Sequence, residues 1–307
     1  MLRTGARCER DGLVTSYRDS DGARLMSIQT IPTVHLPAGE SIPVMGLGTW
    51  YLGENPARRA SELAALRLGI DLGLTLIDTA EMYGAGAAEV LVGEAIAGRR
   101  DEVFLVSKVL PSHATYADTI EACRRSLRRL GTERLDLYLL HWRGQVPLAQ
   151  TVLAFEELVR LGMIRYWGVS NFDIRDMAEL LRLPGGQAVQ TDQVLFNLTR
   201  RGIEYDLLPT LQEQGIPVMA YSPIEQGRLL RQPTTIAIAN RHEATPAQVA
   251  LAWLMTRDGV STIPRTGTRE HVLENRAAVD LRLTEQDLRM LNQAFPPPRG
   301  PQPLEML

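Results

Sequence analysis

Residues 76–89 of this 307-residue chain read LIDTAEMYGAGAAE, and the interpretation of this stretch decides the fold. An apolar run ends in Asp78, Tyr83 follows five residues later, and Gly84 and Gly86 lie just beyond it. The pattern fits two structures. One is a glycine-rich loop that cradles the phosphates of a dinucleotide. The other is a polar loop at the end of a buried strand, in which the glycines only shape the backbone.

The spacing of the glycines excludes the first structure. The dinucleotide fingerprint has the form G-x-G-x-x-G/A and joins the first strand of a fold to its helix. Counted from Gly84, its third position is Glu89, whose carboxylate would repel a pyrophosphate. The loop also begins five residues past the strand end and belongs to the second strand–helix unit of the chain. We therefore reject a Rossmann dehydrogenase and expect Gly84 and Gly86 to let the chain turn tightly into the next helix.

Outward from this stretch, short apolar runs alternate with segments of helical period. Apolar residues fall on both faces of the runs, as in parallel strands buried on both sides. Between the runs, amphipathic patterns predict helices. Strands that alternate with helices pair in parallel, and right-handed crossovers close such a sheet into a (β/α)8 TIM barrel of the α/β class. The eight runs are residues 44–50, 75–80, 103–109, 135–142, 164–171, 188–196, 216–223 and 259–265, and helical patterns cover residues 56–73, 115–131 and 146–162.

The segments outside this alternation predict additions to one barrel. Residues 33–44 predict an N-terminal β-hairpin, and residues 284–295 predict an extra C-terminal helix followed by a Pro-rich tail over the surface. The strand-like runs leave little room for a second domain, so we expect residues 28–307 to form a single barrel domain. Residues 1–27 are polar, and we expect a disordered N-terminal extension with the natural start at or near Met26.

Composition limits the partners of the chain. Its 33 basic and 36 acidic residues are well mixed and give a net charge of −3, which indicates neither nucleic acid nor a membrane surface as partner. No apolar stretch approaches the roughly 18 residues of a membrane-spanning helix. The two cysteines, Cys8 and Cys123, provide neither a disulfide framework nor a metal spacing, so we expect a cytoplasmic protein. We expect a monomer or a weak homo-oligomer.

Polar side chains end three consecutive predicted strands. In a barrel of this kind the chemistry lies at the C-terminal ends of the strands. Asp78 ends the second strand, Lys108 the third and His141 the fourth, while Tyr83 stands in the loop after Asp78. One charged residue at a strand end usually marks only the exit to solvent. Because all these residues converge on one rim, they predict an active site.

The chemistry of this quartet indicates proton transfer to a carbonyl oxygen. A free tyrosine has a pKa of about 10, which makes it a poor acid near neutrality. A neighbouring ammonium group favours the phenolate, so we expect Lys108 to lower the pKa of Tyr83 while Asp78 holds the lysine in place. His141 orients a carbonyl or shares the proton relay. Such an acid protonates an alkoxide as it forms, which is what hydride delivery to a carbonyl requires.

The chain resembles the aldo-keto reductases. The matching motifs are GLGTW (46–50), IDTAEMYG (77–84), SKV (107–109), LLHW (139–142), GVSNF (168–172), DQVLFN (192–197), AYSP (220–223) and IPRT…EN (263–275), in the family's order over roughly residues 33–295. Through LLHWRG, RGIEYDLLP and the C-terminal helix and tail it is most similar to bacterial methylglyoxal-reductase-type members. The resemblance implies NADP(H) as preferred hydride donor, a small-molecule carbonyl substrate such as methylglyoxal, and no metal. It implies Tyr83 as general acid, Lys108 and Asp78 as its support, and His141 as the group that orients the carbonyl.

The same motifs imply a cofactor site and a substrate pocket. The implied cofactor contacts are Thr49, Trp50 and Asp78; Ser170, Asn171 and Gln193 at the nicotinamide carboxamide; Tyr221 stacked on the ring; Ser222, Pro223, Ile224 and Gln226 along the pyrophosphate; Arg265 and Thr266 at the 2′-phosphate; and Glu274 and Asn275 at the adenine. His271 stands where the family often has a second arginine, so NAD(H) use becomes more plausible although NADPH remains the expected cofactor. Trp50 and Trp142 are implied as pocket walls beside His141.

Two other functions remain to be weighed. A metal-dependent barrel hydrolase needs several His and Asp residues at strand ends, whereas only Asp78 and His141 qualify and no pair of histidines has a metal-binding spacing. A catalytically slow NADP(H)-binding redox sensor or regulatory subunit of the same fold is the second alternative. The intact quartet favours turnover and leaves a sensing role open.

Overall fold

Eight parallel strands, in the order in which they occur in the chain, form the main sheet of this computed structural model, which describes residues 15–17, 26–28 and 30–307. Each of the eight apolar runs contains one strand, so the strand predictions are confirmed. The strands are β5 (Leu47–Gly48), β6 (Leu76–Asp78), β7 (Phe104–Val109), β8 (Leu135–Leu140), β9 (Ile164–Ser170), β10 (Asp192–Leu195), β11 (Val218–Tyr221) and β12 (Val260–Thr262).

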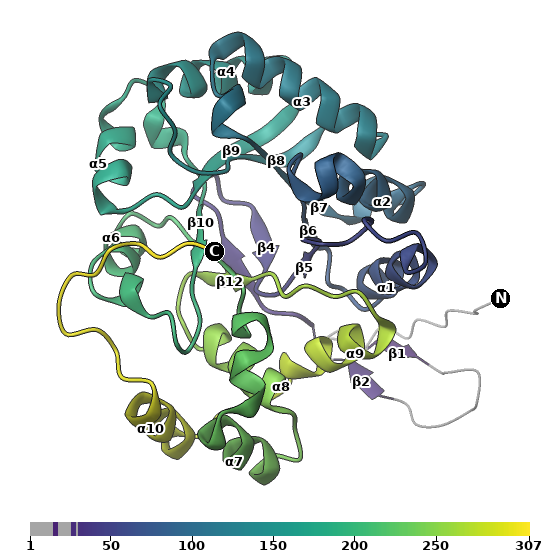
Figure 1. Ribbon diagram of the computed structural model, residues 1–307, viewed down its shortest axis with the longest axis vertical. Helices are drawn as coiled ribbons and strands as arrows, with labels where there is room; N and C mark the ends of the chain where they lie inside the picture. The colour runs from purple at the N-terminus through teal and green to yellow at the C-terminus, as the bar shows by residue number, and fades with distance from the viewer. Residues whose placement is uncertain (1–14, 18–25, 29) are drawn as a thin grey trace.

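The first and last strands of this sheet meet and close it into a barrel. Parallel bridges join Met45 to Thr262 and Gly48 to Arg265. The backbone hydrogen bonds there are 2.8 Å from the Thr262 N–H to Val44 and 2.9 Å from the Gly46 N–H to Thr262. The ring of strands can be followed in Figure 1. The predicted (β/α)8 barrel is therefore confirmed.

Helices surround the ring of strands (Figure 1). In α3, Thr115 caps the first turn by accepting a hydrogen bond from the Asp118 N–H, and Gly131 ends the helix with a left-handed φ of 62°. The helix pattern predicted from Pro56 holds, but the regular helix begins three residues later, at Arg59. The helices are α1 (Arg59–Asp71), α2 (Ala87–Ile96), α3 (Tyr116–Leu130), α4 (Leu148–Arg160), α5 (Ile174–Arg182), α6 (Leu207–Glu213), α7 (Pro233–Arg241), α8 (Pro246–Met255), α9 (Arg269–Ala278) and α10 (Glu285–Ala294).

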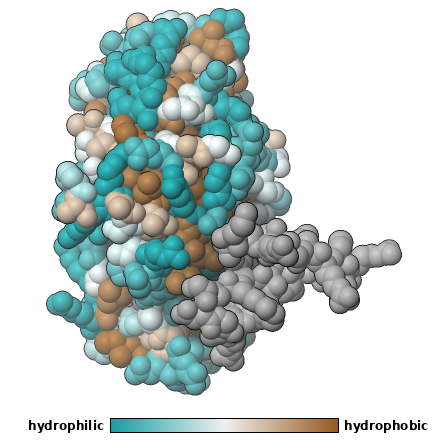
Figure 2. Space-filling model, turned by 90° about the vertical axis from the view of Figure 1, so that its right-hand side faces the viewer, coloured by the Kyte–Doolittle hydropathy of each residue, from teal (hydrophilic) through white to brown (hydrophobic). Residues whose placement is uncertain are grey.

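The apolar core fills the space within the barrel and between its strands and helices. Both faces of β7 and β8 are buried along their whole length, as expected for strands covered on each side. On the face seen in Figure 2, hydrophilic and hydrophobic residues are intermixed over the outer surface. Large exposed apolar residues such as Leu153 and Val159 lie on the outer side of the helix layer. No helix in the described part of the chain is long and apolar enough to cross a membrane.

The predicted N-terminal hairpin is present before the barrel. Strands β3 (Thr33–His35) and β4 (Ser41–Pro43) pair antiparallel, with Val34 opposite Ile42 and both side chains buried. In Figure 1 the hairpin is visible through the ring of strands. Glu40, in the turn between the two strands, forms an ion pair with Arg165 at the start of β9. The hairpin therefore covers the amino-terminal end of the barrel.

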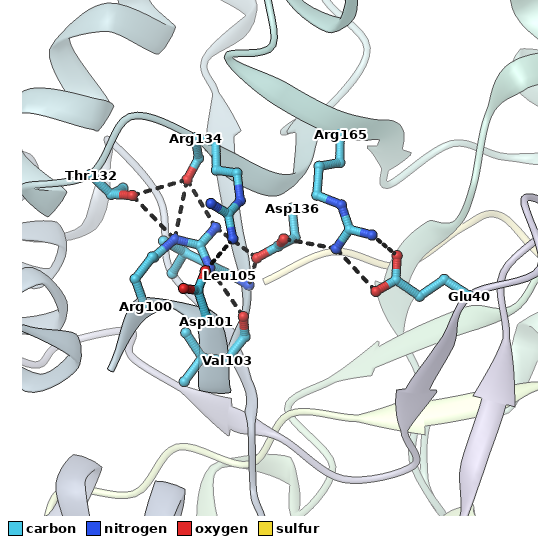
Figure 3. Close-up of polar contacts among 9 residues, drawn as sticks. All are labelled: Glu40, Arg100, Asp101, Val103, Leu105, Thr132, Arg134, Asp136 and Arg165. Carbon is cyan, nitrogen blue, oxygen red and sulfur yellow. Dashed lines mark hydrogen bonds and ion pairs between the residues drawn. The ribbon is translucent and has the colours of Figure 1, made fainter. Parts of the chain in front are cut away.

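A buried carboxylate organises this amino-terminal end (Figure 3). Asp136, at the start of β8, accepts hydrogen bonds from Arg100 Nη2 at 2.7 Å, the Leu105 N–H at 2.8 Å and Arg165 Nη1 at 3.1 Å. The carboxylate is buried, but it has two cationic partners and a backbone donor, which offsets the cost of removing it from water. This end of the barrel is thus tied together by structural ion pairs. In barrels of this kind the active site lies at the opposite end, at the carboxyl-terminal ends of the strands.

The N-terminal extension contains two short strands that the sequence did not predict. β1 (Thr15–Tyr17) pairs antiparallel with β2 (Met26–Ile28). Our expectation of a disordered extension over residues 1–27 is not tested by these two segments. Residues 1–14, 18–25 and 29 lie outside the described residues, and the prediction made for them stays a prediction.

One buried acid in the barrel wall lacks a full set of partners. Asp192 begins β10, and one of its carboxyl oxygens accepts a 3.4 Å hydrogen bond from the Phe172 N–H. The other oxygen is buried without a partner among the described residues. Burial raises the pKa of Asp192 well above its ordinary value, and Asp176 and Asp173 add to the rise. The folded protein therefore keeps Asp192 protonated at pH values at which the unfolded chain has released this proton.

We expect Asp192→Asn to gain stability relative to the wild type as the pH rises. Above the unfolded pKa of about 3.9 the unfolded chain binds fewer protons, so the wild-type free energy of unfolding falls by about 1.4 kcal/mol per pH unit until the folded pKa is reached. Asparagine has the same shape and no proton to release, so the variant lacks this slope. Melting temperatures of both proteins from about pH 4 to about pH 8 test this. A difference that does not grow in favour of the variant would mean that Asp192 is ionised in the folded state.

Candidate active site

A cavity of about 260 Å³ opens at the carboxyl-terminal ends of the barrel strands. Its walls come from the ends of β5, β6, β9 and β11 and from the loops that follow them. The structure therefore brings together side chains that lie far apart in the sequence. The predicted site residues that line this cavity are Thr49, Trp50, Asp78, Tyr83, His141, Trp142, Ser170, Asn171, Gln193, Tyr221, Ser222 and Arg265.

Lys108 stands behind the cavity wall and is fully buried. Its ammonium group donates to Asp78 Oδ2 at 2.7 Å, to the Thr79 carbonyl at 2.9 Å and to the Tyr83 hydroxyl at 3.0 Å. An ammonium group has three N–H donors, so these three partners use all of them. Burial lowers the pKa of Lys108, and the neighbouring Asp78 carboxylate opposes that effect. The lysine is thereby fixed in one position beside the tyrosine.

A tight turn after β6 places Tyr83 over the cavity. The residue begins a short helical turn, Tyr83–Gly86, in which Gly84 has a φ of 55° and Gly86 a φ of 95°. A Cβ atom at Gly86 would lie 2.5 Å from Cδ of Arg129, so no larger residue fits there without a shift. The structural role predicted for these glycines is confirmed.

The direction of the pKa shift of Tyr83 differs from our prediction. Burial raises the pKa of Tyr83 well above its ordinary value, and the negative charge of Asp78 raises it further. The expectation of a lowered pKa is therefore wrong, because burial removes the hydration that a charged phenolate needs. The phenol stays protonated. Since its oxygen already accepts a hydrogen bond from Lys108, its own proton is free to be donated into the cavity.

Asp78 and Gln193 extend this network across the barrel. The second carboxylate oxygen of Asp78 accepts a 2.8 Å hydrogen bond from Gln193 Nε2. The same nitrogen lies 3.0 Å from the sulfur of Met219. The amide nitrogen of Gln193 is thus engaged with the protein, while the residue also lines the cavity.

His141 is a neutral imidazole at the cavity wall. Burial lowers the pKa of His141 well below its ordinary value of about 6.5, and the charge of Lys108 lowers it further. Its Nδ1 is buried without a partner among the described residues, and its ring meets that of Tyr83 edge to face, with centroids 5.8 Å apart. A neutral imidazole carries one N–H. His141 can therefore donate a hydrogen bond to a ligand in the cavity without bringing a positive charge.

A hydrogen-bond chain fixes the polar residues on the opposite wall. Ser170 donates to the Gln193 carbonyl at 2.7 Å, and Asn171 Nδ2 donates to the His141 carbonyl at 3.1 Å. Tyr221 donates its hydroxyl proton to Asn171 Oδ1 at 2.9 Å. Asn171 has a left-handed φ of 58°, which turns the chain at the end of β9. The half-buried Tyr221 ring is thereby held at the edge of the cavity.

Two tryptophans form apolar parts of the wall. Trp50 is stacked on Tyr51 with ring centroids 4.5 Å apart, and Trp142 packs on the His141 ring at 4.9 Å. Both tryptophans are half-buried. Both line the cavity together with Tyr83 and His141.

The remaining predicted cofactor residues lie outside the cavity lining. Arg265 at its edge is exposed, whereas Thr266 beside it is buried. On α9, His271 is exposed, and the Glu274 carboxylate already accepts a hydrogen bond from Thr245. The predicted residues that do not line the cavity are Pro223, Ile224, Gln226, Thr266, His271, Glu274 and Asn275.

The sequence did not predict one wall of this cavity. The C-terminal tail does not stay on the outer surface, because Met306 and Leu307 line the cavity. Figure 1 shows the chain end at the mouth of the barrel. Burial raises the pKa of Tyr221, and a hydrogen bond from the backbone of Leu307 opposes the rise. The apolar residues after the prolines were the available signal. Gly48, Met82 and Ile263 also line the cavity and were not predicted.

Among the described residues, no three His, Cys, Asp or Glu side chains lie so that they could hold a metal ion.

Known proteins are similar to this chain in sequence and in fold. Residues 44–295 match the profile of the Aldo/keto reductase family. The chain is 53% identical over 272 residues to methylglyoxal reductase YeaE of Escherichia coli, covering 87% of this chain and 96% of that protein. It is 35% identical over 280 residues to glyoxal reductase of Bacillus subtilis, covering 90% and 97% respectively. The crystal structure of an aldo/keto reductase from Klebsiella pneumoniae in complex with NADP and acetate aligns with a TM-score of 0.88 and 50% identity, covering 91% of this chain and 100% of that one. The chain belongs to the aldo-keto reductase family.

Proposed function

We propose that this protein reduces aldehydes and ketones, methylglyoxal among them, to alcohols with NADPH as the hydride donor. One observation carries the proposal. The phenol oxygen of Tyr83 accepts a hydrogen bond from Lys108, and the phenol remains protonated, so that its proton can be donated into the cavity. Support comes from a relative named methylglyoxal reductase and from a similar structure in complex with NADPH.

The residues around the cavity fit a nicotinamide dinucleotide. The half-buried Tyr221 ring offers a flat apolar surface, and Ser170, Asn171 and Gln193 place polar groups beside it. Arg265 at the cavity edge supplies an exposed guanidinium for a phosphate. When bound, the cofactor supplies a hydride. Tyr221, Ser170, Asn171 and Arg265 would hold it, with Ser222 at the start of the loop after β11.

The catalytic quartet would then handle the substrate oxygen and its proton. The neutral His141 donates a hydrogen bond that orients the carbonyl oxygen. Tyr83 gives its proton to that oxygen as negative charge develops on it. The Lys108 ammonium, 3.0 Å from the phenol oxygen, stabilises the phenolate that remains, and Asp78 holds the lysine. Trp50 and Trp142 would enclose the carbon skeleton of a small carbonyl compound.

Steady-state NADPH consumption with methylglyoxal and other small aldehydes tests the proposal. An enzyme turns over many equivalents of NADPH, whereas a redox sensor of the same fold binds the cofactor and consumes almost none. Binding of NADPH without consumption with any carbonyl would favour the sensor.

Replacing Arg265 by alanine should raise the KM for NADPH far more than the KM for NADH. A hydrogen bond to a charged group contributes about 1.5–3 kcal/mol, so the NADPH effect should be on the order of ten- to a hundredfold. NADH lacks the 2′-phosphate and serves as the internal control. His271→Arg is the converse variant and should lower the NADPH KM, because it adds a cation near the same phosphate. Equal effects of Arg265→Ala on both cofactors would remove Arg265 from the 2′-phosphate site.

Carbonyl reduction should depend little on pH between about 6.5 and about 10. The raised pKa of Tyr83 keeps the phenol protonated throughout this range, and the lowered pKa of His141 keeps the imidazole neutral. The measurement is kcat/KM for methylglyoxal against pH at saturating NADPH. A decline with an apparent pKa inside the range would mean that one of the two groups titrates there.

A further inference from the structure

The end of the tail separates the catalytic cavity from a second cavity. We call residues 301–307 the tail wall. Its last two residues, Met306 and Leu307, line the catalytic cavity, while residues 301–305 line a neighbouring cavity of about 450 Å³. Figure 1 shows this segment returning from α10 across the open end of the barrel. The position of the tail wall therefore determines the shape of the catalytic cavity.

The tail wall is held by few apolar contacts. Leu304 is half-buried and packs against the core, but the other residues of the wall are exposed. Met306 and Leu307 are each 48% exposed. With a cavity behind it, the wall lacks the close packing that fixes core segments. Polar contacts must then contribute much of what holds it in place.

One arginine supplies such a contact and joins the wall to the loop after β11. Arg200 Nη1 forms an ion pair with Glu305 of the tail wall. Its Nε and Nη2 donate to Glu225 Oε1 at 3.1 and 2.9 Å. Glu225 is buried and has a left-handed φ of 48°, as does its neighbour Gln226 at 52°. Such a backbone persists only where its surroundings hold it.

Asn197 also connects the loop after β11 to the segment after β10. Asn197 Nδ2 donates to Glu225 Oε2 at 2.8 Å and to the Ser222 carbonyl at 2.9 Å. Ser222 lines the catalytic cavity. Residues 222–226, which we call the cofactor loop, are thus held from the segment after β10, and the tail wall is tethered to that segment through Arg200.

We propose that Arg200 is a positioning residue that couples the cofactor loop to the tail wall, so that a dinucleotide bound at the loop stabilises the wall in its closed position against the substrate. The proposal rests on the proposed function. A guanidinium held at Glu225 has less freedom to lose when it binds Glu305, so order in the loop favours order in the wall. The coupling acts in both directions, because linkage between two binding sites is reciprocal.

The exposure of the ion pair sets the size of the effect. The Arg200 and Glu305 side chains are 31% and 43% exposed, so solvent weakens their attraction. Exposed pairs of this kind change an equilibrium by at most about fivefold. Glu225 is buried and depends on Arg200 as an ion-pair partner. Replacing Arg200 therefore perturbs the cofactor loop as well as the tail wall.

A double-mutant cycle tests the coupling. Glu305→Gln should raise the KM for methylglyoxal by up to about fivefold and, because the coupling is reciprocal, should weaken the affinity for NADP⁺, measured by protein fluorescence, by no more than the same factor. Arg200→Gln should raise the KM and should weaken NADP⁺ binding more than Glu305→Gln does, because it also removes the contact with Glu225. In the Arg200→Gln background, Glu305→Gln should add nothing further. Arg228→Gln is the matched control, since Arg228 also contacts Glu225 but not the tail, and it should leave the methylglyoxal KM unchanged. The proposal would be overturned if the effects of Arg200→Gln and Glu305→Gln on the methylglyoxal KM were additive, or if Glu305→Gln alone did not change this KM.

Limited trypsin digestion gives a readout that does not depend on turnover. Arg299 is exposed two residues before the tail wall, and release of the fragment that begins at Gly300 can be followed by mass spectrometry. NADP⁺ should slow this cleavage in the wild type and should not slow it in Glu305→Gln. Equal slowing in both proteins, or none in the wild type, contradicts the coupling. If the wild type shows the protection but reduces no carbonyl, the coupling stands and the proposed function fails.

Discussion

Replacing Tyr83 by phenylalanine should lower kcat/KM for carbonyl reduction by about 10²- to 10⁴-fold, the usual contribution of general acid catalysis. The variant keeps the ring that lines the cavity and loses the one proton that the phenol can give to the substrate oxygen. The assay is NADPH oxidation with methylglyoxal and with a second small aldehyde.

Cofactor affinity is the control for this variant. Phenylalanine keeps the packing of the ring against His141, so NADP⁺ should bind to Tyr83→Phe about as well as to the wild type. Near-full activity of the variant on every carbonyl tested would show that Tyr83 is not the proton donor.

Replacing Lys108 by methionine should reduce both activity and stability. The Lys108 and Asp78 side chains are 0% and 3% exposed, so the variant leaves a buried carboxylate with Gln193 as its remaining side-chain partner. Removing one partner of a buried ion pair typically costs about 3–5 kcal/mol. Activity should fall because the phenolate left by proton transfer has no cation beside it. Denaturant unfolding and NADPH oxidation measure the two effects on the same preparation.

A second substitution separates the two effects of Lys108→Met. Adding Asp78→Asn removes the unpaired charge, so the double variant should recover most of the lost stability. Its activity should remain low, because the ammonium group beside Tyr83 is still missing. Recovery of activity together with stability would mean that Lys108 acts only by supporting the fold.

The barrel was predictable because strands that are buried on both faces appear in the sequence as short apolar runs. β7 and β8 are buried throughout, and each lies within an apolar run. β5 was harder to delimit, since its regular part is only Leu47–Gly48 within the predicted residues 44–50. Met45, outside the regular part of that run, reaches β12 through an isolated bridge to Thr262, which depends on the closure of the whole barrel.

The proximity of the quartet was also predictable, because strand ends in a barrel converge on one rim. Lys108 does contact both Asp78 and Tyr83. The direction of the Tyr83 pKa shift was not predictable. It depends on the loss of hydration and on the charge of Asp78, and the sequence does not reveal how deeply the phenol is buried.

The tail wall and its tether lay beyond sequence reasoning for a different reason. Residues 301–307 have no periodic pattern, so their apolar residues indicated that part of the tail packs against the protein but not on which surface. Arg200 reaches Glu305 across more than a hundred positions of sequence, and such a contact follows from the fold alone. The same holds for Glu274, whose carboxylate binds Thr245 and whose place at the adenine stays a prediction.

Hydride transfer itself is the central claim and can be observed directly. NADPH that carries deuterium at the transferable position of the nicotinamide is incubated with methylglyoxal and the wild-type protein, and the product is analysed by NMR. We expect deuterium on the carbon whose carbonyl group has been reduced to an alcohol. Transfer of the label should be greatly slowed in Tyr83→Phe. Product without deuterium at that carbon, or no product while NADPH remains bound, would contradict the assignment of this chain as an NADPH-dependent carbonyl reductase.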